Sequence, residues 1–322
     1  LFSGPTKQFS PWMFWFWDAP LDKQQLLSIA GRIMDSGMNP GYVHARWSLG
    51  SFEIGKTWKM DKTPTLDERD WLSDAWFEDF RDVADAAARR GYQLGFVDEF
   101  WWPSGNAAGR VVKEHPELIH SAMVPTLTDF ETSVAVPPCK FASIARIGAE
   151  DTIISSTLRQ VSPGTSIEFG PGRWRLYTFA ERNGAGGLRG RPGVNYMDRN
   201  LPVAFIKEAL EPYANNLGAR IGPLVTGDFN DNEGTYGGPF AWSQDLKDEF
   251  KHRTGRDLEA ALPLILDEDD LGLSPVMRCA WFESVAEIYS GYFGALSDWD
   301  EKRGLYFISN LWEENLYCQA LA

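Results

Sequence analysis

The sequence predicts an α/β fold of the (β/α)8 TIM-barrel type. Short apolar segments alternate with helical segments that have one apolar face, and the connections between them are short. Several of the apolar segments end in carboxylates and aromatic residues, as the strands of a barrel do at its catalytic face. The length of 322 residues suits one barrel or two smaller domains.

The first three strand–helix steps follow from hydrophobic spacing and helix caps. Asp22 begins a helix that Gly37 ends, and Ser73 begins a second helix that Gly91 ends. Each helix has apolar residues at three- and four-residue spacing, so each has one face to bury. The strands expected in this part cover residues 13–17, 41–44 and 94–97.

The pattern changes after the third strand. From 120 to 173 the chain has short β-like runs between Pro- and Gly-bearing turns, without a helical period. We interpret this stretch as a small β insertion, and residues 174–179 as the fourth strand of the barrel. The expected organisation is therefore a first part of the barrel at 1–119, an inserted β subdomain at 120–173, and a second part of the barrel at 174–322.

The second part continues with the same alternation. A helix is expected over 200–217, with Pro202 in its first turn and an interruption at Pro212. A long helix is expected over 276–302, and the remaining strands over 223–229 and 305–309. Six strand–helix steps are visible where a closed barrel needs eight. We therefore expect a barrel that is incomplete at the C-terminus, within a longer chain that has further domains.

Composition limits the possible partners. The chain has 31 Lys and Arg against 45 Asp and Glu, a formal charge of −14, and no basic tract. This balance argues against nucleic acid and anionic membrane as partners. No apolar run is long enough to span a bilayer. The 14 Trp residues suit both an ordinary core and the stacking of sugar rings.

Carboxylates follow three of the expected strands. Asp98 and Glu99 follow the third, Asp231 and Glu233 the fifth, and Glu313 with its neighbour Glu314 the sixth. In a parallel barrel these strand ends converge on one face, where two carboxyl groups could cleave a glycosidic bond. Taken singly, each acid could instead be a solvated surface charge or a helix cap.

Other polar and aromatic residues lie beside the same strand ends. Trp101 and Trp102 follow Glu99 directly and offer flat surfaces for a sugar. Asp18 follows the first strand, and His44 and Arg46 end the second; a structural role is an equal alternative for each. No spacing of His and Cys predicts a transition-metal site, and no motif predicts an organic cofactor. Among the acids, an oxygen-rich calcium site is compatible with the sequence.

Several of these segments resemble the TIM-barrel α-L-rhamnosidases of glycoside hydrolase family 106 and their relatives. The most specific similarity is the Asp-Glu pair at 98–99 with Trp-Pro-Ser-Gly at 102–105. Similarity continues over nearly the whole chain. The other segments that carry it are 14–21, 41–46, 255–258, 262–263 and 311–313.

The resemblance implies hydrolysis of a terminal α-L-rhamnosyl group with inversion, and a calcium ion that helps to hold the sugar. By position, Glu99 resembles the general acid and Glu233 the general base. Glu313 resembles a further acidic contact that could exchange roles with Glu233. The expected substrate-binding residues are Asp18, His44, Arg46, Asp98, Trp101, Trp102, Asp231 and Trp312. The calcium ligand is expected to be Glu313 or Asp231.

The chain departs from the family pattern at two places. Asp231 and Glu233 are separated by an Asn where relatives have an Asp-Glu pair, so either acid could be the acting group. Residue 310 is Asn where a His is common. Two alternatives stay open: another exo-glycosidase on the same barrel, or a catalytically inactive carbohydrate-binding relative. The leading hypothesis is a secreted or periplasmic glycosidase whose partner is a carbohydrate.

Overall fold

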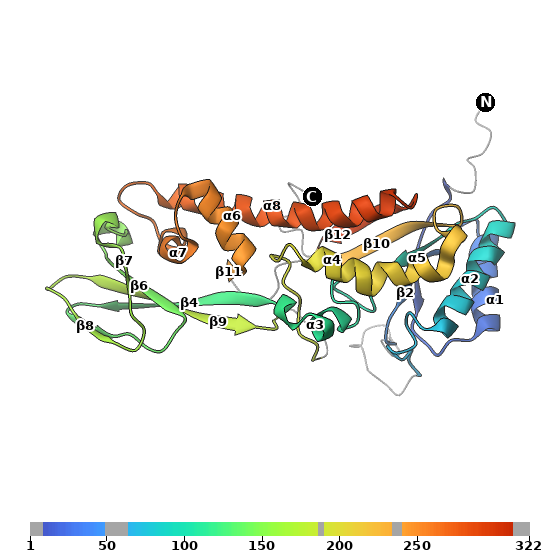
Figure 1. Ribbon diagram of the computed structural model, residues 1–322, viewed down its shortest axis with the longest axis horizontal. Helices are drawn as coiled ribbons and strands as arrows, with labels where there is room; N and C mark the ends of the chain where they lie inside the picture. The colour runs from blue at the N-terminus through green and yellow to red at the C-terminus, as the bar shows by residue number, and fades with distance from the viewer. Residues whose placement is uncertain (1–8, 49–63, 186–189, 234–239, 312–322) are drawn as a thin grey trace, which may run out of the picture. The chain divides into compact units, whose positions relative to one another are not determined.

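The computed structural model describes residues 9–48, 64–185, 190–233 and 240–311 (Figure 1). The chain divides into two compact units. The first comprises Leu1–Pro116, Pro202–Gly234 and Phe293–Glu313, and the second comprises Glu117–Leu201, Thr235–Tyr292 and Glu314–Ala322. Each unit has its own main β-sheet, which is parallel in the first unit and antiparallel in the second.

The first unit is built on a five-stranded parallel sheet whose spatial order follows the chain, β1-β2-β3-β10-β12. The strands expected in this unit are confirmed. The described strands form no closed barrel, and the parallel sheet has five of the six barrel strands that the sequence predicts. The strands are β1 (Phe14–Trp17), β2 (Gly41–Ala45), β3 (Leu94–Val97), β10 (Val225–Glu233) and β12 (Tyr306–Leu311).

The helices of the first unit begin where the capping residues predict. Asp22 accepts a hydrogen bond from the Gln25 N–H at 3.0 Å before α1 (Lys23–Asp35). Ser73 accepts one from the Trp76 N–H at 3.2 Å before α2 (Asp74–Arg89). A side-chain acceptor at this position satisfies an N–H that has no partner within the helix. A short helix, α3 (Arg110–Glu114), follows the loop after β3.

The helix expected over 200–217 has three parts. They are α4 (Leu201–Phe205), a π-helical turn at Ile206–Leu210, and α5 (Glu211–Leu217). Pro212 lies in the first turn of α5, directly after the π-helical turn. The expected interruption at Pro212 therefore takes the form of a π-helical turn just before it. The wider turn can accommodate a proline, which has no N–H to donate within the helix.

The two faces of the parallel sheet have different surroundings. On one face, Trp17 of β1 lies 4.8 Å from Trp76 of α2, measured between ring centroids. On the same face, Phe96 of β3 stacks on Tyr213 of α5 at 4.0 Å. Alternate residues point to the opposite face, which we call the inner face, and many of them are exposed apolar side chains. They include Phe14 (38%), Phe16 (41%), Ile308 (36%) and Tyr306 (71%).

Two glycines make room for a tyrosine on the inner face. Tyr42 of β2 pairs with Gly95 of β3, and Gly227 occupies the next strand. A Cβ atom at Gly95 or at Gly227 would lie 2.7 Å from the Tyr42 ring. Any larger residue at either position would displace this ring, so the two glycines determine where Tyr42 packs.

The second unit contains an antiparallel sheet in the order β11-β4-β9-β6-β7. The fourth barrel strand expected at residues 174–179 is wrong: these residues lie in β9, which pairs antiparallel with β4 and β6. The antiparallel sheet therefore continues beyond the 120–173 range expected for the insertion. Its strands are β4 (Ser121–Phe130), β6 (Phe141–Arg146), β7 (Arg159–Val161), β9 (Trp174–Asn183) and β11 (Phe240–Ala241), with a separate pair formed by β5 (Ser133–Ala135) and β8 (Ser166–Glu168).

Three helices follow β11. Ser243 caps α6 (Gln244–Thr254), and Gly255 ends it in a left-handed conformation. α7 (Leu258–Leu266) comes next, and then the long α8 (Ser274–Glu301). Residues of α8 up to Tyr292 belong to the second unit, and those from Phe293 belong to the first. Within the described ranges, no helix has the length and apolar character needed to cross a membrane.

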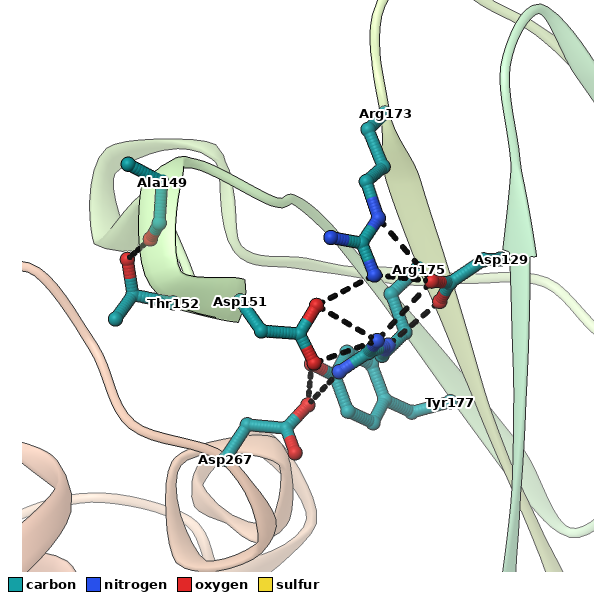
Figure 2. Close-up of polar contacts among 8 residues, drawn as sticks. All are labelled: Asp129, Ala149, Asp151, Thr152, Arg173, Arg175, Tyr177 and Asp267. Carbon is teal, nitrogen blue, oxygen red and sulfur yellow. Dashed lines mark hydrogen bonds and ion pairs between the residues drawn. The ribbon is translucent and has the colours of Figure 1, made fainter.

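An arginine on β9 holds three parts of the second unit together (Figure 2). The Arg175 guanidinium lies 2.6 Å from Asp129, 3.2 Å from Asp151 and 2.9 Å from Asp267. Tyr177, two residues further along β9, donates its hydroxyl to Asp267 at 2.6 Å. Arg175 is only 8% exposed, so these contacts compensate a buried charge and connect β4, β9 and the C-terminal end of α7.

Candidate active site

The loop that follows β3 is attached to the strands on both sides of β3. The Trp101 N–H donates to the Ala45 carbonyl at the end of β2, at 2.9 Å. The Ser104 N–H donates to the Asp231 carbonyl near the end of β10, at 2.8 Å. The Asp98 N–H also donates to Phe229 of β10. These bonds hold the loop over the C-terminal ends of three neighbouring strands.

The Glu99 side chain anchors this loop by accepting hydrogen bonds from the loop's own backbone. Its Oε1 accepts hydrogen bonds from the N–H groups of Phe100 at 3.0 Å and Ala108 at 2.5 Å. Its Oε2 accepts from Asn106 at 2.9 Å and Ala107 at 2.7 Å. Ala107 and Ala108 have φ values of 50° and 58°, and this left-handed backbone directs their N–H groups to the carboxylate.

The surroundings of Glu99 favour an anchoring role over the general-acid role that the resemblance implies. The side chain is 2% exposed, and both oxygens accept from two backbone donors. Such donors stabilise the ionised carboxylate, whereas a general acid has to carry a proton that it can pass to the substrate.

Asp98 is fully buried and points to different partners. Its Oδ1 accepts from the Ser104 hydroxyl at 2.5 Å, and its Oδ2 accepts from the Asn230 amide at 2.6 Å. The Ser104 hydroxyl also accepts from the Asp231 N–H at 2.8 Å. Burial raises the pKa of Asp98 well above its usual range, although both hydrogen bonds oppose this shift. Asp98 thus connects β3, its loop and β10.

Asp231 is the described carboxyl group best placed for chemistry. It lies on β10 opposite Asn310 of β12, and the Asn310 amide donates to its Oδ1 at 3.0 Å. Phe229 and Asp231 alternate with Asn230, so Asp231 is on the inner face of the sheet. Its exposure is 9%, and burial raises its pKa against the effect of the Asn310 bond. A raised pKa is what a carboxylic acid needs to donate a proton.

His44 fixes the backbone beside the two tryptophans. Its Nε2 lies 2.6 Å from the Trp101 carbonyl, so this nitrogen donates and carries the proton. His44 is 1% exposed, and burial lowers its pKa to about 4. The imidazole is therefore neutral near pH 7, and it orients the loop through a neutral hydrogen bond.

Arg46 presents a buried cation next to aromatic rings. Its guanidinium carbon lies 3.7 Å from the centroid of Phe16 and 5.6 Å from that of Trp101. The side chain is 8% exposed, and its Nε has no hydrogen-bond partner among the described residues. Burial lowers the pKa of Arg46, and the charge of the half-buried Asp18 opposes this effect. Arg46 is thus able to donate to an oxygen of a bound molecule.

The aromatic surface consists of stacked rings. Trp101 and Trp102 lie 4.4 Å apart between centroids, with an angle of 13° between the ring planes. Trp101 is buried, while Trp102 is half-buried and therefore the ring that solvent reaches. The His44 ring lies 6.2 Å from Trp102. The expected association of Trp101, Trp102, His44 and Arg46 is thus present in the structure.

A second pair of carboxyl groups was not predicted from the sequence. Asp228 of β10 and Asp300 of α8 interact with each other, and both are fully buried. Burial raises the pKa of Asp300 to about 7, while Asp228 and the charge of Arg303 oppose the shift. Side chains along β10 alternate between the two faces of the sheet, which directs Asp228 and Asn230 away from the inner face. This alternation is the feature of the sequence that could have indicated a buried Asp228.

Several expected site residues fall outside the structural description. Trp312, Glu313 and Glu314 lie outside the described residues. Glu233 is the last residue of β10, but the structure does not describe its side chain. Ser104, Asn230 and Asn310, none of which was predicted as a site residue, are the polar groups that hold the acids.

The described residues do not form a calcium site by themselves. Calcium takes six to eight oxygen ligands. Of the two carboxylates expected as ligands, Asp231 is described and is bound to Asn310, whereas Glu313 is not described. In the described part of the chain, no three His, Cys, Asp or Glu side chains gather closely enough to hold a metal ion.

Comparison with known proteins supports the fold. No protein-family model matches the chain, and no curated protein matches it in sequence. Among solved structures, the chain is similar to a rhamnosidase from Novosphingobium sp. PP1Y, with a TM-score of 0.57 and 10% sequence identity. This similarity covers 99% of the chain and 48% of the rhamnosidase, so the chain spans about half the length of that protein. At this identity the similarity concerns the fold alone, which is a mixed α/β arrangement.

Proposed function

We propose that the chain carries the active site of a glycoside hydrolase that removes a terminal α-L-rhamnosyl or similar residue. The observation that carries the proposal is Asp231, an acid of raised pKa at the mouth of a parallel sheet, beside the loop with Trp101 and Trp102. Carboxyl groups and flat rings at one sheet edge suit glycosidic cleavage and the stacking of sugars. The similarity in fold to a rhamnosidase supports the same function.

The parallel sheet supports a (β/α)8 barrel as the complete architecture. Its five strands follow the order of the chain, as adjacent strands of a barrel wall do. Helices cover one face, and apolar side chains such as Phe16 and Ile308 are exposed on the other. A doubly wound sheet would have helices on both faces. The inner face thus resembles the inside of a barrel wall, and we propose that further strands of a longer chain close it.

In this proposal Asp231 is the general acid. Its proton passes to the glycosidic oxygen as the bond to the anomeric carbon breaks. Glu233 remains the proposed general base, which takes a proton from the water that attacks the anomeric carbon from the other side. Two carboxyl groups about 6.5–9.5 Å apart would give inversion, and a separation of about 5 Å would give retention.

The other residues of the site bind the sugar. Trp102 offers its half-buried ring to the apolar side of the sugar and to the methyl group of a 6-deoxy sugar such as rhamnose. The Nε of Arg46 donates to a sugar hydroxyl, which would satisfy this buried nitrogen. His44 acts through the Trp101 carbonyl and keeps the two tryptophans in position.

Hydrolysis of an aryl α-L-rhamnoside by the Asp231→Asn variant tests the proposal. We expect kcat/KM to fall by about 10²–10⁴-fold, because the amide is too weak an acid to transfer a proton to the leaving oxygen. Asp70→Asn, at an exposed aspartate of the same unit, is the matched control and should keep full activity. Turnover near that of the unmodified protein in Asp231→Asn would refute the assignment. A screen of other aryl glycosides separates a rhamnosidase from another exo-glycosidase.

A second candidate function is carbohydrate binding without turnover. The Asn310 amide donates to Asp231 at 3.0 Å, at the position where the resembling family has a histidine. This bond favours the ionised form of Asp231 and so works against proton donation. Calorimetry would favour this candidate if rhamnose binds while no aryl glycoside is hydrolysed.

A further inference from the structure

A cavity of about 300 Å³ belongs to the second unit, and none of the residues assigned to the active site lines it. Its walls come from β6, from β7 and the segment that leads into it, from the link between α6 and α7, from α7, and from the segment that follows α7. A sphere of this volume is about 8 Å across, so the groups that line it lie within reach of one small molecule. Three features of the lining define what the cavity could hold.

The first feature is a buried hydroxyl. Ser143 of β6 lines the cavity, is 1% exposed, and its Oγ has no hydrogen-bond partner among the described residues. Its strand neighbours Ala142 and Ile144 belong to an apolar cluster with Leu176. A buried hydroxyl without a partner is unfavourable, and it is rare in folded proteins. A polar atom of a ligand in the cavity would satisfy it.

The second feature is a pair of arginines. Arg159 and Arg256 both line the cavity. No carboxylate of the described chain lies within 4 Å of either guanidinium, whereas Arg175 and Arg253 of the same unit each contact several. The Arg159 guanidinium lies 4.9 Å from the ring of Phe169, a contact that leaves its N–H donors available at the edge of the group. Both side chains are exposed, so in a chain with a formal charge of −14 they place two cations without acidic partners at the solvent-facing side of the cavity, where an anion can bind.

The third feature is the apolar part of the lining. None of the described residues that line the cavity is aromatic, and its apolar lining includes four leucines: Leu158, Leu264, Leu271 and Leu273. Aliphatic walls suit an aliphatic body, whereas a sugar ring is usually held by an aromatic ring. The cavity therefore differs in character from the surface formed by Trp101 and Trp102.

We propose that this cavity binds a small amphipathic carboxylate. Its two oxygens accept from the guanidinium groups of Arg159 and Arg256 and from the Ser143 hydroxyl, and its aliphatic body packs on the four leucines. A carboxylate has about four acceptor sites and commonly binds arginine through paired hydrogen bonds. This site is independent of the proposed hydrolase activity, since none of its residues belongs to the unit that carries Asp231.

Titration of the full chain with hexanoate, followed by calorimetry and by amide chemical shifts, tests the proposal. We expect a Kd of about 1 mM for an acid of this size, with shifts centred on β6 and α7. Arg159→Gln and Arg256→Gln should each weaken binding by about 10-fold or more, and Ser143→Ala by several-fold. Arg182→Gln, at an exposed arginine of β9, is the control and should bind hexanoate normally. The thermal unfolding of each variant reports whether it is folded.

Three results would overturn the proposal. The first is the absence of hexanoate binding at 20 mM, about 20 times the expected Kd. The second is binding of hexanol as tight as that of hexanoate, since the arginines would then have no role. The third is unchanged affinity in both arginine variants while they remain folded. Acetate should bind more weakly than hexanoate, because it does not reach the leucines, and equal affinity would contradict the apolar part of the proposal.

Discussion

Glu99→Gln tests the anchoring role of Glu99 directly. Glutamine has nearly the same shape as glutamate, so the substitution replaces one carboxylate oxygen with an amide group and changes little else. Each carboxylate oxygen accepts from two backbone N–H groups, Phe100 and Ala108 on one side and Asn106 and Ala107 on the other. In either orientation of the glutamine side chain, its NH2 group therefore faces two backbone N–H donors, and it cannot accept a hydrogen bond from them.

The expected loss of stability follows from these contacts. A hydrogen bond to a charged group contributes about 1.5–3 kcal/mol, so the loss of two should lower the free energy of unfolding by about 3–6 kcal/mol. For a unit of this size, that corresponds to a fall in Tm of roughly 6–24 °C. The burial of Glu99, at 2% exposure, prevents water from replacing the lost bonds.

Urea unfolding followed by tryptophan fluorescence measures this loss. The matched control is Glu301→Gln, at an exposed glutamate of the same unit, which should change the free energy of unfolding by less than about 0.5 kcal/mol. The reasoning would be refuted if Glu99→Gln unfolds like the unmodified protein yet loses hydrolase activity by orders of magnitude. That result would return Glu99 to the general-acid role and make Asp231 an accessory residue.

Three further substitutions test the buried polar groups. Ser104→Ala should destabilise the protein by about 3 kcal/mol in urea unfolding, because it removes the hydroxyl bound to the buried carboxyl of Asp98. Tyr177→Phe should cost about 1–2 kcal/mol in the same assay through the lost bond to Asp267, and a neutral result would contradict that bond. Burial raises the pKa of Asp300 to about 7, above roughly 3.9 in the unfolded chain. The contribution of this shift to the free energy of unfolding is therefore fully present below about pH 4, and it is lost as the pH rises through 7. Unfolding of the wild-type protein should therefore become easier by about 3 kcal/mol between pH 5 and pH 8, and Asp300→Asn should remove most of this dependence; an equally steep profile in the variant would show that another group titrates.

Features that depend on neighbouring residues in the chain were predictable. The helix caps at Asp22, Ser73 and Ser243 each use a side chain and an N–H three residues later, so the sequence contains the whole interaction. The short apolar strands 41–44 and 94–97 were equally clear, because a parallel sheet buries them on both faces and leaves a continuous apolar run.

Features that depend on distant partners were not predictable. Residues 174–179 have the composition of a strand, but nothing in them indicates that β9 pairs antiparallel with β4 instead of joining the parallel sheet. The anchoring of Glu99 depends on the left-handed backbone of Ala107 and Ala108, and alanine gives no signal of that conformation. The cavity beside Ser143 forms between segments that are far apart in the chain, from Ser143 to Gln160 and from Arg256 to Leu273, so no local pattern could indicate it.

Under the proposed assignment of Asp231 as the general acid, the acidic pair that follows β3 has a different role and holds the loop. Asp98 and Glu99 are adjacent, so their side chains point in different directions: one reaches across to Asn230, and the other turns back into its own loop. Each is buried and satisfied by several donors, and together they hold the loop that carries Trp102. An acid that donates a proton needs the opposite surroundings, with few donors and access to the inner face. Asp231, held by one amide on the neighbouring strand, meets that requirement among the described acids of the sheet, and the rigid loop built by Asp98 and Glu99 is what keeps the aromatic surface beside it.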